Sequence, residues 1–134
     1  MKKVLALIIL CGSTFAHADI KKIDADYSKC AEEAISTMDS RICASEATDL
    51  ADKELNLVFQ TAKKELTAAN DADSKEILKR LVAAQRAWIT YRDANCSLGG
   101  TQMLNGSGES QIISGCIATT TIERVIELKS ILGQ

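Results

Sequence analysis

The stretch ADKELNLVFQTAKKEL, residues 51–66, decides the fold of this chain. Its apolar side chains recur at steps of three and four residues, which places them on one face of an α-helix. The members of this face are Ala51, Leu55, Val58 or Phe59, Ala62 and Leu66. The pattern predicts an amphipathic helix that begins near Glu46 and is closed by Asn70 and Asp71.

A second long helix is expected over residues 74–98. Asp73 or Ser74 can cap its first turn, and Gly99-Gly100 should end it, because glycine tolerates the left-handed end of a helix. The connection between the two helices is so short that they must run antiparallel as a hairpin. The apolar stripe of the second helix consists of Leu78, Leu81, Trp88 and Cys96, widened by Ile77, Val82 and Ile89.

Helical patterns flank this hairpin on both sides. A shorter helix is expected over residues 24–37 and a last one over residues 111–132, after a loop at 101–110 that is rich in glycine, asparagine and serine. The chain contains no proline. We therefore predict an all-α fold: an antiparallel helical hairpin with a shorter N-terminal helix and a C-terminal helix.

The N-terminus has the features of a secretory signal peptide. Lys2 and Lys3 precede an apolar run at residues 4–10, and Ala16-His17-Ala18 provides small residues for cleavage. The run is too short for a membrane anchor, which needs about 20 residues. The expected domains are a signal peptide at 1–18 and one helical domain at 19–134, periplasmic or secreted. Lipid attachment at Cys11 is the alternative, but Leu10 stands where a lipoprotein signal has a small residue.

Four cysteines remain after this cleavage: Cys30, Cys43, Cys96 and Cys116. An even number of cysteines in a short exported domain predicts two disulfides, and four cysteines allow three pairings. Local pairing, Cys30 with Cys43 around a turn at 38–40 and Cys96 with Cys116 around the glycine-rich loop, needs the fewest long-range meetings and is favoured. The Cys-x2-Cys spacing typical of a zinc site is absent, so no metal and no cofactor are expected.

The composition of residues 19–134 argues against catalysis. The segment has no histidine, the commonest general base, no expected free thiol and no phosphate-binding glycine loop. It holds 14 basic and 18 acidic residues, a net charge of −4, which also disfavours a nucleic-acid partner. We expect a binding protein rather than an enzyme.

Polar residues interrupt the apolar stripes. Gln85 and Arg92 face the same way as Trp88, while Asn56 lies beside the stripe of the first long helix and Arg124 lies on the last helix. Because buried polar groups need hydrogen-bond partners, these residues predict either an internal structural network or a ligand-facing patch. The network is favoured, with Trp88 in the core.

Three groups of residues together carry a family resemblance. They are DKELN at 52–56, AQRAWITYRDANC at 84–96, and Cys116 followed by Thr120, Arg124 and Leu128. With this pattern the chain resembles the lysozyme inhibitor LprI family over about residues 30–132. The resemblance implies a small exported helical domain that binds and inhibits lysozyme, and it assigns no inhibitory residue.

The loop tethered by Cys96 and Cys116 is the natural candidate for a binding element, because a tethered loop loses less entropy on binding. Its candidate contact residues are Gln102, Asn105, Ser107 and Glu109. A plain solvent-exposed connection is the alternative. Many lysozymes are strongly basic, so a net-acidic protein would meet them faster. A periplasmic module that binds another envelope protein or wall component, without inhibiting lysozyme, is the second hypothesis for function.

Overall fold

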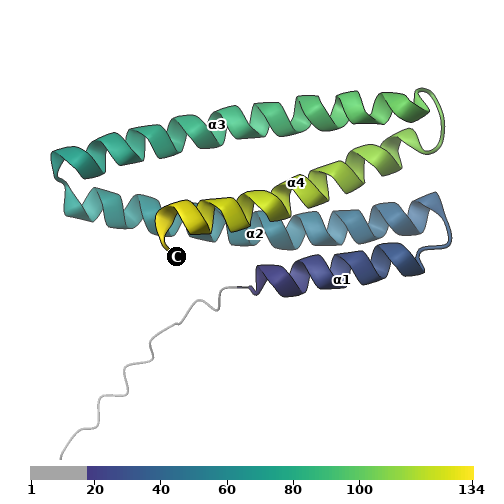
Figure 1. Ribbon diagram of the computed structural model, residues 1–134, viewed down its shortest axis with the longest axis horizontal. Helices are drawn as coiled ribbons and strands as arrows, with labels where there is room; N and C mark the ends of the chain where they lie inside the picture. The colour runs from purple at the N-terminus through teal and green to yellow at the C-terminus, as the bar shows by residue number, and fades with distance from the viewer. Residues whose placement is uncertain (1–17) are drawn as a thin grey trace, which may run out of the picture.

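The structure, a computed structural model, describes residues 18–134. All of the expected signal peptide except Ala18, and with it Cys11, lies outside the described residues. The elements are α1 (Ile20–Glu33), α2 (Thr37–Ala69), α3 (Ala72–Gly100), the short 3-10 helix η1 (Thr101–Met103) and α4 (Glu109–Leu132). Residues 18–134 contain no strand, and the prediction of an all-α fold is confirmed (Figure 1).

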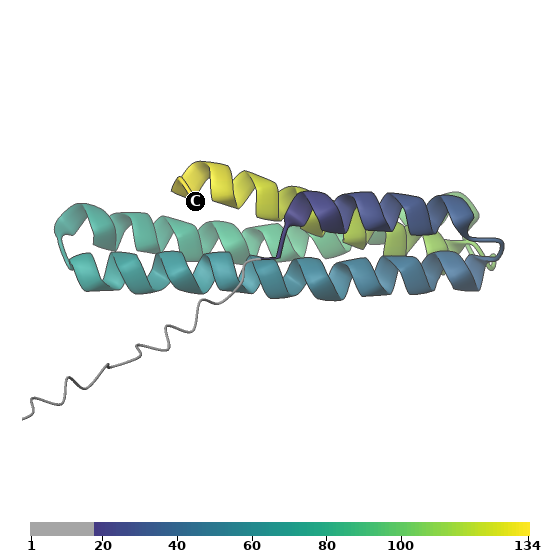
Figure 2. The same cartoon turned by 90° about the horizontal axis from the view of Figure 1, so that it is seen from below.

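The four helices form an elongated bundle in which each helix runs antiparallel to the next (Figure 1). α2 and α3 form the predicted hairpin, and α4 returns along both of them. The shorter α1 packs against α2 and α4, and Figure 2 shows α1 and α4 on the same side of α2. One end of the bundle therefore holds both the α1–α2 turn and the α3–α4 loop, while the other end holds the α2–α3 turn alone (Figure 1).

The core lies where α2 meets α4. On α2 the buried positions repeat at steps of three and four residues and include several alanines, which allow a neighbouring helix to approach closely. These residues are Ala44, Ala47, Ala51, Leu55, Val58 and Ala62, and α4 faces them with Ala118, Ile122, Val125 and Leu128. α1 adds Ile20 and Ile23, and α3 adds Leu81.

The first two helices begin earlier than expected. α1 starts at Ile20, where the Asp19 side chain accepts a hydrogen bond from the Lys21 amide at 3.0 Å. α2 starts at Thr37 instead of near Glu46, because the Ser36 hydroxyl accepts from the Asp39 amide at 3.1 Å and caps the helix there. Residues 38–40, predicted to be a turn, form the first turn of α2, and the reversal lies at residues 34–36.

The ends of α3 also differ from the prediction. Asn70 adopts the left-handed conformation (φ 55°) after α2, and Asp71, not Asp73 or Ser74, caps α3 by accepting from the Ser74 amide at 2.8 Å. Gly99 does not stop α3, which continues through Gly100. α4 begins at 109, two residues earlier than expected.

Gly100 is needed for close packing rather than for helix termination. It is buried, and a Cβ at this position would lie 2.7 Å from Cγ1 of Ile113 on α4. Glycine thus permits the close approach of α3 and α4 at the bridged end of the bundle.

Candidate functional site

Both connections at one end of the bundle are closed by disulfides. Cys30–Cys43 joins α1 to α2 with a Cα–Cα distance of 5.7 Å, and Cys96–Cys116 joins α3 to α4 with a distance of 5.4 Å. The local pairing predicted from the sequence is confirmed. We call this part of the molecule the bridged end; it comprises residues 30–43 and 96–116.

The α3–α4 loop is held in successive tight turns. The Leu104 amide donates to the Thr101 carbonyl at 3.2 Å, and the Gly106 amide donates to the Met103 carbonyl at 2.7 Å. Asn105 has a positive φ of 61°, a conformation that asparagine tolerates better than most residues. The loop therefore presents its side chains from an ordered backbone.

The four loop residues proposed as contacts do not share one environment. Gln102, Asn105 and Ser107 are exposed. Glu109 is half-buried in the first turn of α4, and its carboxylate accepts a hydrogen bond from the Asn105 amide at 2.9 Å. The structure thus gives Glu109 a role in shaping the loop and leaves the other three open to solvent.

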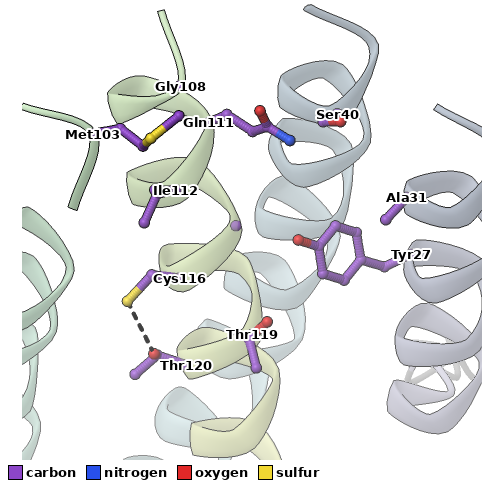
Figure 3. A pocket seen from close by; sticks show the side chains of 11 residues that line it. Tyr27, Ala31, Ser40, Met103, Gly108, Gln111, Ile112, Cys116, Thr119 and Thr120 are labelled. Carbon is purple, nitrogen blue, oxygen red and sulfur yellow. Dashed lines mark hydrogen bonds between the residues drawn. The ribbon is translucent and has the colours of Figure 1, made fainter. Parts of the chain in front are cut away.

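A groove of about 560 Å³ runs between α1, α2 and α4 beside this loop (Figure 3). Its walls are lined by Tyr27, Ala31, Ser40, Met103, Gly108, Gln111, Ile112, Gly115, Cys116, Thr119 and Thr120. The lining mixes hydroxyl, amide and apolar groups and contains no charged side chain. The groove can therefore accept a neutral polar or apolar group.

Tyr27 is the most prominent side chain in this groove, and its ring extends from α1 toward α4 (Figure 3). Burial raises the pKa of the Tyr27 hydroxyl, and a hydrogen bond with Thr119 opposes this shift. A Cβ on Gly115 would lie 3.2 Å from the hydroxyl oxygen, so glycine leaves the space that Tyr27 occupies. Neither residue was singled out from the sequence, although Tyr27 follows the buried Ile23 by four residues, one helical turn.

Arg124 lies at the centre of a polar network between α3 and α4. The residue is 8% exposed. Its Nε donates to Oε1 of Gln85 at 3.2 Å, and its Nη1 lies 2.6 Å from a carboxylate oxygen of Glu127. Its guanidinium carbon is 5.7 Å from the centre of the Trp88 ring.

Arg92 approaches the same ring, at 5.1 Å from its centre. Its Nε contacts a carboxylate oxygen of Asp93 at 2.9 Å, and its Nη1 donates to the Thr121 hydroxyl at 3.3 Å. The same Nη1 lies 3.7 Å from a carboxylate oxygen of Asp52. Burial raises the pKa of Asp52, and the positive charge of Arg92 opposes this rise. The guanidinium groups are thus balanced by acids and an aromatic face.

The structure brings together four of the five polar or core residues singled out from the sequence: Gln85, Trp88, Arg92 and Arg124. Asn56 is a correction, because it is exposed on α2. It follows Leu55 by one residue, a rotation of about 100° around the helix that carries it off the buried face.

Trp88 is also less buried than expected. It packs against the edge of the core and is half-buried.

We expect Trp88→Ala to lower the free energy of unfolding by about 2 kcal/mol, because part of an aromatic side chain and two cation–π contacts are lost. Urea denaturation measures the change. Tyr91→Ala, on the exposed face of the same helix, is the control and should change the free energy of unfolding by less than about 0.5 kcal/mol. Equal losses in the two variants would contradict the packing of Trp88 against the core.

Residues 18–134 hold neither a cluster of metal-binding side chains nor a membrane-spanning helix. No group of three or more His, Cys, Asp or Glu side chains there could hold a metal ion. None of the helices in this part of the chain is long and apolar enough to cross a membrane.

A protein-family model described as "Lysozyme inhibitor LprI" matches residues 28–128. The chain belongs to this family. The LprI match begins two residues before Cys30 and ends at Leu128, the last buried apolar residue of α4. Both disulfides and the network around Arg124 therefore fall within the part of the chain that matches the family model.

One curated relative extends this similarity over nearly the whole chain. An uncharacterized protein of Rhizobium meliloti (strain 1021) is 36% identical over 138 residues, which cover 96% of this chain and 91% of the relative. No solved structure matches this chain. The similarity over this length indicates that the relative shares the helical bundle described above.

Proposed function

We propose that this protein is an exported binding protein that inhibits lysozyme or a related cell-wall hydrolase. The observation that carries the proposal is the match to the lysozyme inhibitor LprI family over residues 28–128. The described site is consistent with binding rather than turnover, since the groove at the bridged end is lined by uncharged side chains.

Export is supported by the disulfides. Cys30–Cys43 and Cys96–Cys116 are the kind of bridge that forms and persists in oxidising compartments such as the periplasm. With the signal-like N-terminus, they favour cleavage after Ala18 and a mature domain at 19–134. This domain would then meet wall hydrolases in the periplasm or outside the cell.

The proposal is tested by measuring lysis of bacterial cell walls. Purified mature protein is added in micromolar excess to c-, g- and i-type lysozymes, and we expect at least one of them to lose activity. The association rate should fall as salt rises, because attraction between an acidic inhibitor and a basic enzyme is screened. Full activity of all three types would contradict the proposal and favour the envelope-module hypothesis.

A further inference from the structure

We infer that the α1–α2 turn and the α3–α4 loop form one two-part docking surface, which occupies the substrate cleft of a basic wall hydrolase. This inference rests on the proposed function and names the surface that performs it. The surface is defined by five exposed apolar residues at the bridged end: Ile35 and Met38 from the turn side, and Leu98, Met103 and Leu104 from the loop side.

Packing within this chain does not account for the exposure of these apolar side chains. Ile35 is 96% exposed at the tip of a three-residue reversal, and Leu98 and Leu104 are 69% and 60% exposed. Single exposed apolar residues are common on protein surfaces, but several gathered at one place mark an interaction site. All five belong to the turn, the loop or the adjoining helix ends, and Figure 1 shows both connections at one end of the elongated bundle.

The turn and the loop are parts of one surface rather than two separate tips. A groove of about 410 Å³ is lined by Thr37 and Arg41 at the start of α2 together with Gly106 and Ser107 of the loop. The groove that contains Tyr27 likewise joins Ser40 of α2 to Met103. The two connections therefore face each other across shared grooves at the end of the bundle.

Both parts are already ordered before any partner binds. Each is closed by its own disulfide, and the Ser36 hydroxyl also contacts the Asp39 carboxylate at 2.7 Å beside Ile35. An ordered surface loses little conformational entropy on association. The narrow end of an elongated bundle, with its surface held by two disulfides, suits a cleft better than a flat partner surface.

Charge indicates which kind of partner fits this end. The bridged end carries Glu32, Glu33, Asp39 and Glu109 against only Arg41. The opposite end, residues 63–86, has more basic than acidic residues. The basic residues are Lys63, Lys64, Lys75, Lys79, Arg80 and Arg86, and the four acids are Glu65, Asp71, Asp73 and Glu76. A basic enzyme would orient this elongated molecule so that the bridged end arrives first.

The test compares three double variants of the mature protein against a lysozyme that the wild type inhibits. The turn variant is Ile35→Ser with Met38→Ser, and the loop variant is Leu98→Ser with Leu104→Ser. The control removes two apolar side chains of similar exposure away from this end, Ile77→Ser with Ile131→Ser. Because all six positions are exposed, the helical circular dichroism and melting temperature of each variant should stay close to those of the wild type.

We expect the turn variant and the loop variant each to raise the inhibition constant by about tenfold or more, and the control to leave it within about twofold. A loss in the loop variant alone would contradict the two-part surface. Inhibition by both variants at the wild-type level would overturn the docking surface while leaving the proposed function intact. Failure of the wild type to inhibit any lysozyme would instead contradict both proposals.

Discussion

Replacing Cys30 and Cys43 together by alanine is expected to lower the free energy of unfolding by about 3 kcal/mol, with the loss concentrated in α1. The estimate follows from the 13-residue separation of the two cysteines, because a bridge that closes a loop of this size restricts the unfolded chain. The location follows from packing. α1 has 14 residues, of which only Ile20 and Ile23 are buried, and a helix of this length is marginal by itself in water.

Hydrogen exchange and urea denaturation measure the two parts of this expectation. In the double variant, amides of residues 20–33 should lose protection while those of α2 and α4 keep it. Cys96→Ala with Cys116→Ala is the matched comparison: it opens a loop of similar size, but it lies between α3 and α4, which both contribute to the core. Protection should then fall across the whole bundle. Wild-type protection of α1 without its bridge would show that packing alone holds this helix.

The order of the helices and the pairing of the cysteines were predictable, because both depend on the spacing of residues that are close together in the sequence. The three- and four-residue steps of Ala51, Leu55 and Ala62 identify a buried face wherever the helix starts. The disulfides followed from the proximity of each cysteine pair to a predicted connection. The local pairing was therefore right even though the α1–α2 reversal was placed several residues too late.

Helix boundaries were predicted less well, because each boundary depends on a single contact, either a capping hydrogen bond or a tertiary contact. Ser36 and Ser40 are equally good capping residues by type, and only the structure shows that Ser36 accepts the amide hydrogen bond. Glycine at position 100 is typical of a helix end, but here the residue allows α3 to approach Ile113 of α4 closely. Such contacts join residues that are distant in sequence, so periodicity does not reveal them.

The candidate site was predictable only in part. The loop was proposed as a binding element from its cysteine tether, whereas the turn was overlooked because the reversal between the first two helices was placed too late in the sequence. Tyr27 and Gly115 were missed because their roles depend on the packing of α1 against α4. Glu54 was missed for another reason: its charge suggests an exposed residue, although it follows Ala51 by three residues and precedes Val58 by four, on the buried face of α2.

Lys129→Met is expected to destabilise the protein by about 3 kcal/mol or more, because it removes a positive charge that contacts the buried carboxylate of Glu54. Glu54 is 2% exposed, and Nζ of Lys129 on α4 lies 2.5 Å from its Oε1. The other carboxylate oxygen accepts from the Ala18 amide at 2.9 Å. Cleavage after Ala18, as proposed, removes this amide donor and leaves a positively charged α-amino group on Asp19, the next residue.

The matched control is Lys22→Met. Lys22 also forms an ion pair, with Asp26 four residues away, but both side chains are largely exposed, and such a pair contributes less than about 1 kcal/mol. Urea denaturation of the mature protein should separate the two variants clearly. Equal losses would mean that water or a rearranged side chain solvates Glu54 when Lys129 is absent.

A double variant distinguishes the pair itself from the cost of breaking it. Glu54→Leu with Lys129→Met removes both charges and places apolar side chains between α2 and α4. Replacing a buried ion pair by apolar groups is often neutral or stabilising, whereas removal of one partner is not. We therefore expect the double variant to recover most of the stability lost in Lys129→Met. If it stays as unstable as the single variant, the loss comes from packing of the lysine side chain against its neighbours rather than from removal of the positive charge beside Glu54.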